Sequence, residues 1–166
     1  MDLTILYRGP LASCDYDCPY CPFAKRRDSP ERLRADRAAL ERFTAWAAEQ
    51  TGDRLSVLFT PWGEGLVRSW YRRALIELSH LPQVERVAIQ TNLSCRTGWT
   101  AEADPATLAL WCTYHPDQTR TTGFSPSAGS WPRAGCVTAS ASWGCPPIWT
   151  GPADCAPISR ARCTCG

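Results

Sequence analysis

Apolar residues along the chain gather in four short runs, and polar or mixed segments separate these runs. The runs span Leu3 to Arg8, Leu55 to Phe59, Val84 to Ile89 and Leu110 to Tyr114. Continuous apolar runs of this length are typical of parallel strands, and the run at Leu55 to Phe59 is expected of a strand covered on both faces. The pattern therefore predicts four β-strands.

The segments between the runs carry the signals of helices. Ser29-Pro30-Glu31 combines an N-cap serine with proline at the first helical position, and apolar residues recur at helical spacing from there up to Gly52. A second helix is predicted from Ser69 to Leu81, stopped by Pro82, and Asp104-Pro105 is predicted to open a short third one. Strands that alternate with helices predict an α/β fold of parallel βα units with right-handed crossovers.

Cysteines with a distinctive spacing follow the first predicted strand. Cys14, Cys18 and Cys21 form the pattern C-x3-C-x2-C on one short loop. Three thiolates can hold three irons of a [4Fe–4S] cube and leave the fourth iron open, whereas an electron-transfer cluster normally takes four cysteines. The alternative is a structural zinc loop built from the same thiols and a fourth ligand elsewhere, although zinc sites more often come as two C-x2-4-C pairs.

Length and composition limit the class of protein. The chain has 166 residues, about one domain, and its net charge of +2 is too small to argue for nucleic acid or a membrane surface as partner. No apolar run reaches the roughly 18 residues of a membrane span, and no signal peptide opens the chain. We therefore expect the first three cysteines to be cluster ligands in a reducing cytoplasm, without a membrane partner.

The C-x3-C-x2-C loop resembles the signature of the radical SAM superfamily. The resemblance implies that Cys14, Cys18 and Cys21 hold a [4Fe–4S] cluster whose open iron chelates S-adenosyl-L-methionine (SAM), and that Tyr20 lies beside the adenine. It also implies a partial (β/α)6 barrel, of which the predicted elements are about the first half. The implied reaction is reductive cleavage of SAM to a 5′-deoxyadenosyl radical, which takes a hydrogen atom from a substrate. An electron donor such as a flavodoxin or ferredoxin is implied as partner.

Two further motifs follow predicted strands, at the edge where α/β barrels carry their sites. Trp62-Gly63-Glu64-Gly65 stands where radical SAM enzymes have Gly-Gly-Glu-Pro, which binds the SAM amino group; the match carries over only to Gly63 and Glu64. Gln90-Thr91-Asn92 resembles a Q-T-N run common in that superfamily, which implies that Gln90 and Asn92 also contact the cofactor. The alternatives are a solvated loop carboxylate for Glu64 and a polar turn for residues 90–92.

The N-terminal part of the chain also resembles an uncharacterised bacterial radical SAM family. The matching runs are ILYRGP at 5–10, YDCPYCPFAKR at 16–26, QTNLSC at 90–95 and LWCTYHP at 110–116. The similarity covers residues 1 to about 119, and we know of no substrate for this family, small molecule or peptide. We interpret Cys95 and Cys112 as packing residues. His115 could face the pocket, but we interpret it as an ordinary loop histidine.

Residues 120–166 have a different composition. They contain five cysteines and three tryptophans but no Leu, Glu or Lys, and only one of the chain's sixteen acidic residues. Restoring a single C after Thr119 gives another reading frame, in which one nucleotide string encodes both versions and the restored protein contains an amphipathic helix (RFLAQCRELAAR) and a buried strand (YSVGVVG). The sequence therefore predicts a truncated radical SAM core over 1–119, followed by an out-of-frame tail. A natural cysteine-rich tail, disordered or metal-binding, is the alternative.

Three hypotheses about function remain open. The first is the radical SAM enzyme, the second a cysteine-based zinc module without catalysis, and the third an inactive product of a frameshifted gene. With two isoleucines, one valine and no leucine, residues 120–166 cannot bury enough apolar area to offset the cost of ordering the backbone. We therefore predict that this tail forms no strand or helix and that the chain as given is unstable or inactive.

Overall fold

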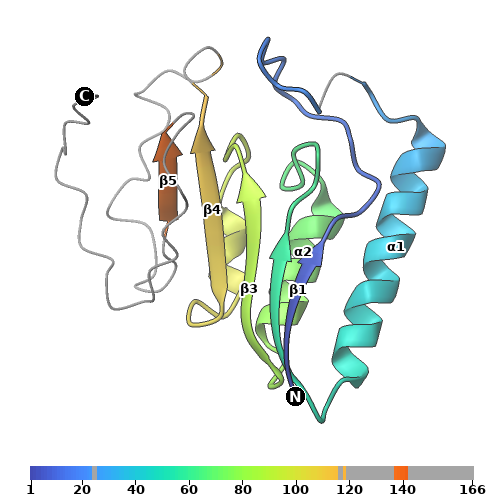
Figure 1. Cartoon of the computed structure of the whole chain (residues 1–166), viewed down its shortest axis with the longest axis vertical. Helices are drawn as coiled ribbons and strands as arrows, with labels where there is room; N and C mark the ends of the chain where they lie inside the picture. The colour runs from blue at the N-terminus through green and yellow to red at the C-terminus, as the bar shows by residue number, and fades with distance from the viewer. Residues whose placement is uncertain (24–25, 116–117, 119–136, 142–166) are drawn as a thin grey trace, which may run out of the picture.

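A parallel sheet with two helices forms the described part of the protein (Figure 1). The computed structural model describes residues 1–23, 26–115 and 118, and the backbone of residues 137–141. The sheet has five strands in the order β1-β2-β3-β4-β5, and every neighbouring pair is parallel. The elements are β1 (Asp2–Tyr7), α1 (Pro30–Glu49), β2 (Arg54–Phe59), α2 (Ser69–Ser79), β3 (Val84–Thr91), the 3₁₀ helix η1 (Gly98–Glu102), β4 (Leu108–Tyr114) and β5 (Val137–Ala141).

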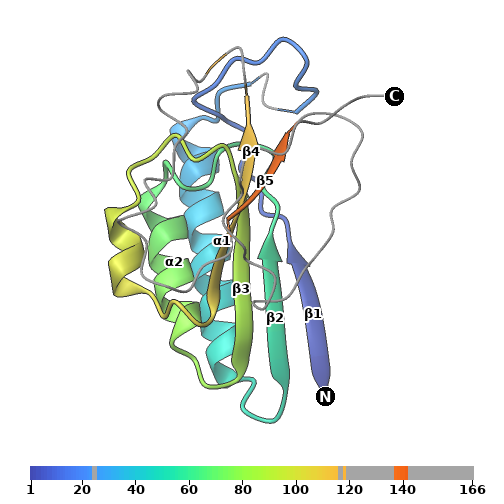
Figure 2. The same ribbon diagram turned by 90° about the vertical axis from the view of Figure 1, so that its left-hand side faces the viewer.

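Helix α1 begins for the reason that the sequence indicated. The hydroxyl of Ser29 accepts a hydrogen bond from the backbone N–H of Arg32 and caps α1, with Pro30 as the first helical residue. Both helices lie on the same side of the sheet (Figure 2). None of the described helices combines the length and the apolar character that a membrane span requires.

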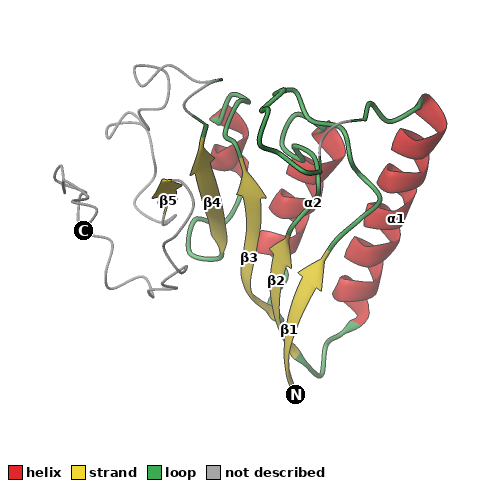
Figure 3. Cartoon of the chain, turned by 45° about the horizontal axis from the view of Figure 1, so that its top comes forward, coloured by secondary structure: helices red, strands yellow, loops and turns green. Residues whose placement is uncertain are grey.

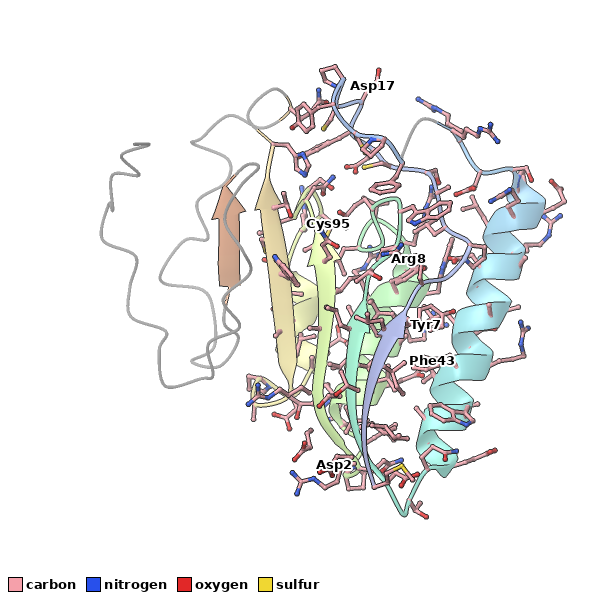
Figure 4. All side chains as sticks on the ribbon, in the orientation of Figure 1. Asp2, Tyr7, Arg8, Asp17, Phe43 and Cys95 are labelled. Atoms are coloured by element: carbon pink, nitrogen blue, oxygen red, sulfur yellow. The ribbon has the colours of Figure 1, made fainter. Side chains whose placement is uncertain are left out.

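The hydrophobic core lies between these helices and one face of the sheet. Side chains alternate along each strand, so every second residue faces the helices. In Figure 4, Tyr7 points from β1 towards Phe43 of α1, and their ring centroids are 4.6 Å apart. Strand residues share the core with helix residues: Leu55, Val57, Phe59, Val87, Ile89, Leu110 and Cys112 from the sheet, and Leu40, Ala47, Tyr71, Ala74, Leu75 and Leu78 from the helices.

The opposite face of the sheet is covered by no described helix. Leu6 is 69 % exposed there, Leu58 is half-buried, and Gln90 is exposed. The expectation that Leu55 to Phe59 is covered on both faces is therefore wrong within the described residues. An apolar run indicates that a strand has at least one buried face. It does not indicate whether both faces are buried when small side chains such as Ser56 alternate with larger ones.

The four predicted strands and the two longer helices are confirmed, within a few residues at their ends. The short helix predicted at Asp104-Pro105 is wrong. Residues 104–107 form a turn in which the carboxylate of Asp104 accepts a hydrogen bond from the N–H of Ala106, and the 3₁₀ helix η1 lies just before it. The same Asp-Pro pair starts turns as readily as helices.

One described strand lies inside the tail that was predicted to form none. β5 pairs parallel with β4 in the register Leu110 to Val137 through Tyr114 to Ala141. The prediction is wrong for these five residues, because an edge strand can satisfy the free N–H and C=O groups of β4 without large aliphatic side chains. The predicted boundary after residue 119 and the cysteines of the tail lie outside the described residues. The structure does not test the predicted reading frame of the tail.

Candidate functional site

Four connecting segments meet at the carboxyl edge of the sheet (Figure 3). The first, which we call the cysteine loop, spans Cys14–Cys21 and follows β1. The second, the Glu64 loop, spans residues 60–68 and follows β2. The residues after β3 begin with Asn92, and those after β4 begin with His115. Because all strands are parallel, their carboxyl ends share one edge, and the predicted site residues therefore gather there.

Asp28 anchors the chain just before the cysteine loop. One of its carboxylate oxygens accepts hydrogen bonds from the N–H groups of Ala12 and Ser13, both at 2.8 Å, and from the Ser13 hydroxyl at 2.9 Å. The other oxygen pairs with the Arg32 guanidinium at 3.1 Å. Desolvation alone would raise the pKa of Asp28, but these donors outweigh it and hold the pKa below its usual value. The residue before Cys14 is thus fixed to the start of α1.

Gly63 brings the Glu64 loop into direct contact with the same residue. The N–H of Glu64 donates to the Ser13 carbonyl at 3.2 Å, and a Cβ atom placed on Gly63 would overlap that carbonyl group. Only glycine allows this approach of the two backbones. The Gly63 backbone thus lies against Ser13, the residue before Cys14, and this contact gives Gly63 a steric reason to be glycine.

Glu64 is a buried carboxylate that joins two loops. Its side chain accepts hydrogen bonds from the N–H of Leu66 at 2.8 Å, the hydroxyl of Thr91 at 2.8 Å and the N–H of Asn92 at 2.7 Å. Glu64 is 3 % exposed, so its interpretation as a solvated loop carboxylate is wrong. Desolvation raises the pKa of Glu64 to about 7, with the three hydrogen bonds opposing the rise.

The three residues 90–92 do not all lie in the site. Thr91 and Asn92 bind Glu64, and the side-chain amide of Asn92 lies 3.1 Å from the Asp15 carboxylate and 3.7 Å from the Cys14 sulfur. Gln90 is exposed on the opposite face, which no described helix covers, and it lies beside Trp111 of β4 in register. The structure therefore brings Asn92 to the cysteine loop and separates Gln90 from it, as strand alternation requires.

The Cys14 sulfur is half-buried and receives hydrogen bonds. The N–H of Tyr16 donates to it at 3.4 Å, in addition to the Asn92 amide. Burial raises the pKa of the Cys14 thiol to about 11, and nearby carboxylates including Asp15 add to the rise while the Tyr16 N–H opposes it. A metal bound here would displace the thiol proton, because the thiolate is the ligand.

Cys18 and Tyr20 both contact His115, which follows β4. The Nδ1 atom of His115 lies 3.4 Å from the Cys18 sulfur and 3.1 Å from the Tyr20 hydroxyl. The rings of His115 and Tyr20 are stacked with an angle of 2° between their planes, and Tyr16 meets the His115 ring edge-on. Desolvation lowers the pKa of His115.

The interpretation of His115 as an ordinary loop histidine therefore missed its place in the site. A signal was available, because His115 directly follows a buried strand, just as Asn92 does. Cys21 lies one turn beyond Cys18, and its N–H donates to the Cys18 carbonyl at 3.1 Å.

The donor set fits an iron–sulfur cluster in its chemistry. Cys14, Cys18 and Cys21 place three cysteine sulfurs on one loop, and thiolates are the usual ligands of such clusters. Within the described residues, however, no three Cys, His, Asp or Glu side chains converge closely enough to hold a metal ion. The three cysteines are thus close in the chain and lie at the same edge of the sheet. The Cys14 sulfur contacts Tyr16 and Asn92, whereas the Cys18 sulfur contacts His115.

Cys112 and Cys95 behave differently from the cysteines of the loop. Cys112 is 0 % exposed in the core, where burial raises its thiol pKa to about 12, and Cys95 packs against the same core. Both positions fit the interpretation as packing residues. Figure 4 shows Cys95 near the carboxyl end of β3, below Asp17 of the cysteine loop.

Comparison with known proteins adds nothing to this picture: no protein-family model, no curated protein and no solved structure matches the chain.

Proposed function

We propose that this chain is a radical SAM protein with a partial (β/α)6 barrel, in which Cys14, Cys18 and Cys21 hold a [4Fe–4S] cluster. The observation that carries the proposal is the set of three cysteines on one loop at the carboxyl edge of a parallel sheet, beside the loops that follow β2, β3 and β4. When bound, such a cluster supplies one electron to SAM, whose sulfur–C5′ bond then breaks to give a 5′-deoxyadenosyl radical for hydrogen abstraction.

The residues of the chain then have distinct tasks in binding. Gly63 and Glu64 shape the loop that faces the SAM amino group. Because the Glu64 carboxylate already accepts three hydrogen bonds, it acts by orienting the backbone of this loop as much as by direct contact. Asn92 supports the Cys14 side of the cysteine loop, and Tyr20 offers an aromatic face at its other end.

Gln90 belongs to the other part of the proposed binding site. It is exposed on the face of the sheet that no described helix covers, and this face becomes the interior if further strands close the barrel. In that position its amide would reach a ligand lying over the sheet rather than the cysteine loop. An external low-potential electron donor, such as a flavodoxin or ferredoxin, and a small-molecule or peptide substrate complete the proposal. A reducing cytoplasm suits such a cluster.

Reconstitution of cysteine variants tests the proposal. The protein and its Cys14→Ala, Cys18→Ala and Cys21→Ala variants are incubated anaerobically with iron and sulfide, and iron, zinc and 5′-deoxyadenosine formed from SAM are measured. We expect about four irons per chain and SAM cleavage in the unchanged protein, and loss of both in each variant. Cys95→Ala, which alters a half-buried cysteine outside the loop, is the matched control and should keep both. Full iron retention in Cys18→Ala would contradict the ligand assignment.

A structural zinc site is the second candidate, and one distance favours it. The separation of 3.4 Å between the Cys18 sulfur and Nδ1 of His115 also suits two ligands of one tetrahedral zinc, in which Zn–S is about 2.3 Å and Zn–N about 2.0–2.1 Å. This candidate predicts one zinc per chain, no iron cluster after reconstitution, and no SAM cleavage. The same metal analysis therefore separates the two functions.

A further inference from the structure

The segment after β4 is attached to the tip of the cysteine loop at two points. His115 contacts Cys18 and Tyr20, and the side-chain carbonyl of Gln118 accepts a hydrogen bond from the N–H of Asp17 at 3.3 Å. The N–H of Gln118 in turn donates to the His115 carbonyl at 3.1 Å, so both contacts come from one turn. This attachment ties one of the three loop thiols to a side chain from a distant part of the sequence.

We propose that His115 donates a hydrogen bond from Nδ1 to the sulfur of Cys18 when that sulfur is a cluster ligand, and thereby raises the reduction potential of the cluster. The inference rests on the proposed function, because it concerns the same cluster. His115 is in this assignment a positioning residue: it acts on the iron through Cys18 and touches no reacting atom.

The chemistry of the two groups supports a hydrogen bond donated by His115 to Cys18 and a higher reduction potential. A ligating thiolate can only accept a hydrogen bond, so it selects the imidazole tautomer that carries its hydrogen on Nδ1. In this tautomer the Tyr20 hydroxyl, 3.1 Å from Nδ1, turns its own hydrogen away and shares the same N–H as a second acceptor. A hydrogen bond donated to a cluster sulfur stabilises the added electron and makes the cluster easier to reduce.

The surroundings of the contact make it effective. Cys18 is 4 % exposed, so water screens the interaction little. The Tyr20 ring, parallel to His115, and the Tyr16 edge fix the plane of the imidazole, which keeps Nδ1 directed at the sulfur. The ring contacts and the donated hydrogen are separate properties of His115, and substitutions can remove one without the other.

Two substitutions at this position separate the donor from the ring. His115→Phe keeps an aromatic ring for Tyr20 and Tyr16 but removes the donor, whereas His115→Asn keeps an N–H donor near the position of Nδ1 and removes the ring. His80→Phe is the matched control, because His80 is the other histidine of the chain and contacts the carbonyl of Glu102 near η1. Each protein is reconstituted, its iron is counted, and its cluster is titrated with EPR detection against a low-potential reductant.

We expect His115→Phe to retain its iron and to show a more negative midpoint. At the wild-type midpoint its ratio of reduced to oxidised cluster should fall about tenfold, which corresponds to 59 mV for a one-electron couple. In His115→Asn the ratio of reduced to oxidised cluster at the wild-type midpoint should stay within about threefold of that in the unchanged protein. His80→Phe should titrate with the unchanged protein.

The possible results separate failure of the proposed function from failure of the proposal about His115. An unchanged protein that binds no [4Fe–4S] cluster overturns the proposed function and this inference with it. A full cluster with the same midpoint in His115→Phe overturns only the inference, and so does an Asn variant shifted as far as Phe, because the donor would then have no effect. Loss of the cluster in His115→Phe also overturns it, since His115 would then hold the cluster rather than tune it.

Discussion

The Glu64 loop and the cysteine loop lie side by side at the same edge of the sheet, but they are held in different ways. The Glu64 loop is held by its own central carboxylate, which is buried and bonded to the backbone of Leu66 and Asn92. The cysteine loop is held mainly by side chains that come from elsewhere, including Asn92 and His115. We therefore expect changes in the Glu64 loop to act mainly on folding, and changes at the side chains that contact the loop thiols to act on what these thiols bind.

We expect the largest effect from a substitution at Gly63, where the two loops are in contact. In Gly63→Ala the added methyl group would overlap the Ser13 carbonyl, so one backbone must move. We expect a loss of about 3 kcal/mol or more in the free energy of unfolding, at the upper end of overpacking effects, measured by urea denaturation. Binding of the proposed cluster should weaken too, because the displaced Ser13 precedes Cys14.

Gly52→Ala is the matched control for this substitution. A Cβ atom on Gly52 meets no atom within 4 Å, so this change should be neutral or stabilise by about 0.4–1 kcal/mol through the unfolded chain. Equal losses in the two variants would contradict the direct contact between the loops.

The buried carboxylate predicts how stability depends on pH. Because the pKa of Glu64 is raised to about 7, the folded protein keeps a proton that the unfolded chain releases near pH 4.5, and stability falls as pH rises between these values. The raised pKa of Asp36 acts in the same direction. The difference between a pKa of 4.5 in the unfolded chain and about 7 in the folded protein corresponds to at most about 3 kcal/mol in the free energy of unfolding.

Glu64→Gln isolates this contribution. Its amide does not titrate, so the free energy of unfolding, measured by urea denaturation from pH 4.5 to 8, should change less with pH than that of the unchanged protein. Any constant cost of the amide beside the Asn92 N–H shifts the whole curve without changing its slope. If the two curves stay parallel, Glu64 is not buried as described.

A smaller effect is expected at the anchor of the cysteine loop. Asp28→Ala removes a nearly buried carboxylate that accepts three hydrogen bonds from Ala12 and Ser13, and we expect a loss of about 2 kcal/mol in the free energy of unfolding. Glu31→Ala removes an exposed carboxylate that pairs with Arg34 and should change stability far less. A loss in Glu31→Ala as large as in Asp28→Ala would show that surface charge, not the anchor, is responsible.

The sequence was sufficient for the strands and the two longer helices because each is a local pattern. Leu55 to Phe59 is apolar except at Ser56, and Ser29-Pro30 caps a helix whatever surrounds it. The position of Cys14, Gly63 and Asn92 at one edge also followed, since parallel strands place their carboxyl ends together. These predictions needed only the order of elements along the chain.

Other features depend on contacts that no local pattern encodes. The burial of Glu64 follows from the register of β2 against β3, which sets Thr91 and Asn92 opposite its loop. The approach of His115 to Cys18 depends on where β4 ends relative to the cysteine loop. β5 depends on the free edge of β4 more than on its own composition. The radical SAM function and the frame of residues 120–166 stay predictions.

The order of the strands in the sheet is the order of the strands in the chain, and this has a consequence for synthesis on the ribosome. Each new strand emerges beside an edge that the preceding strand has already formed, so the sheet can grow from its N-terminal edge without waiting for later segments. The cysteine loop would be made first and completed last. It gains its support from the Glu64 loop, then from Asn92, and finally from His115, which places its maturation after the release of β4 from the ribosome.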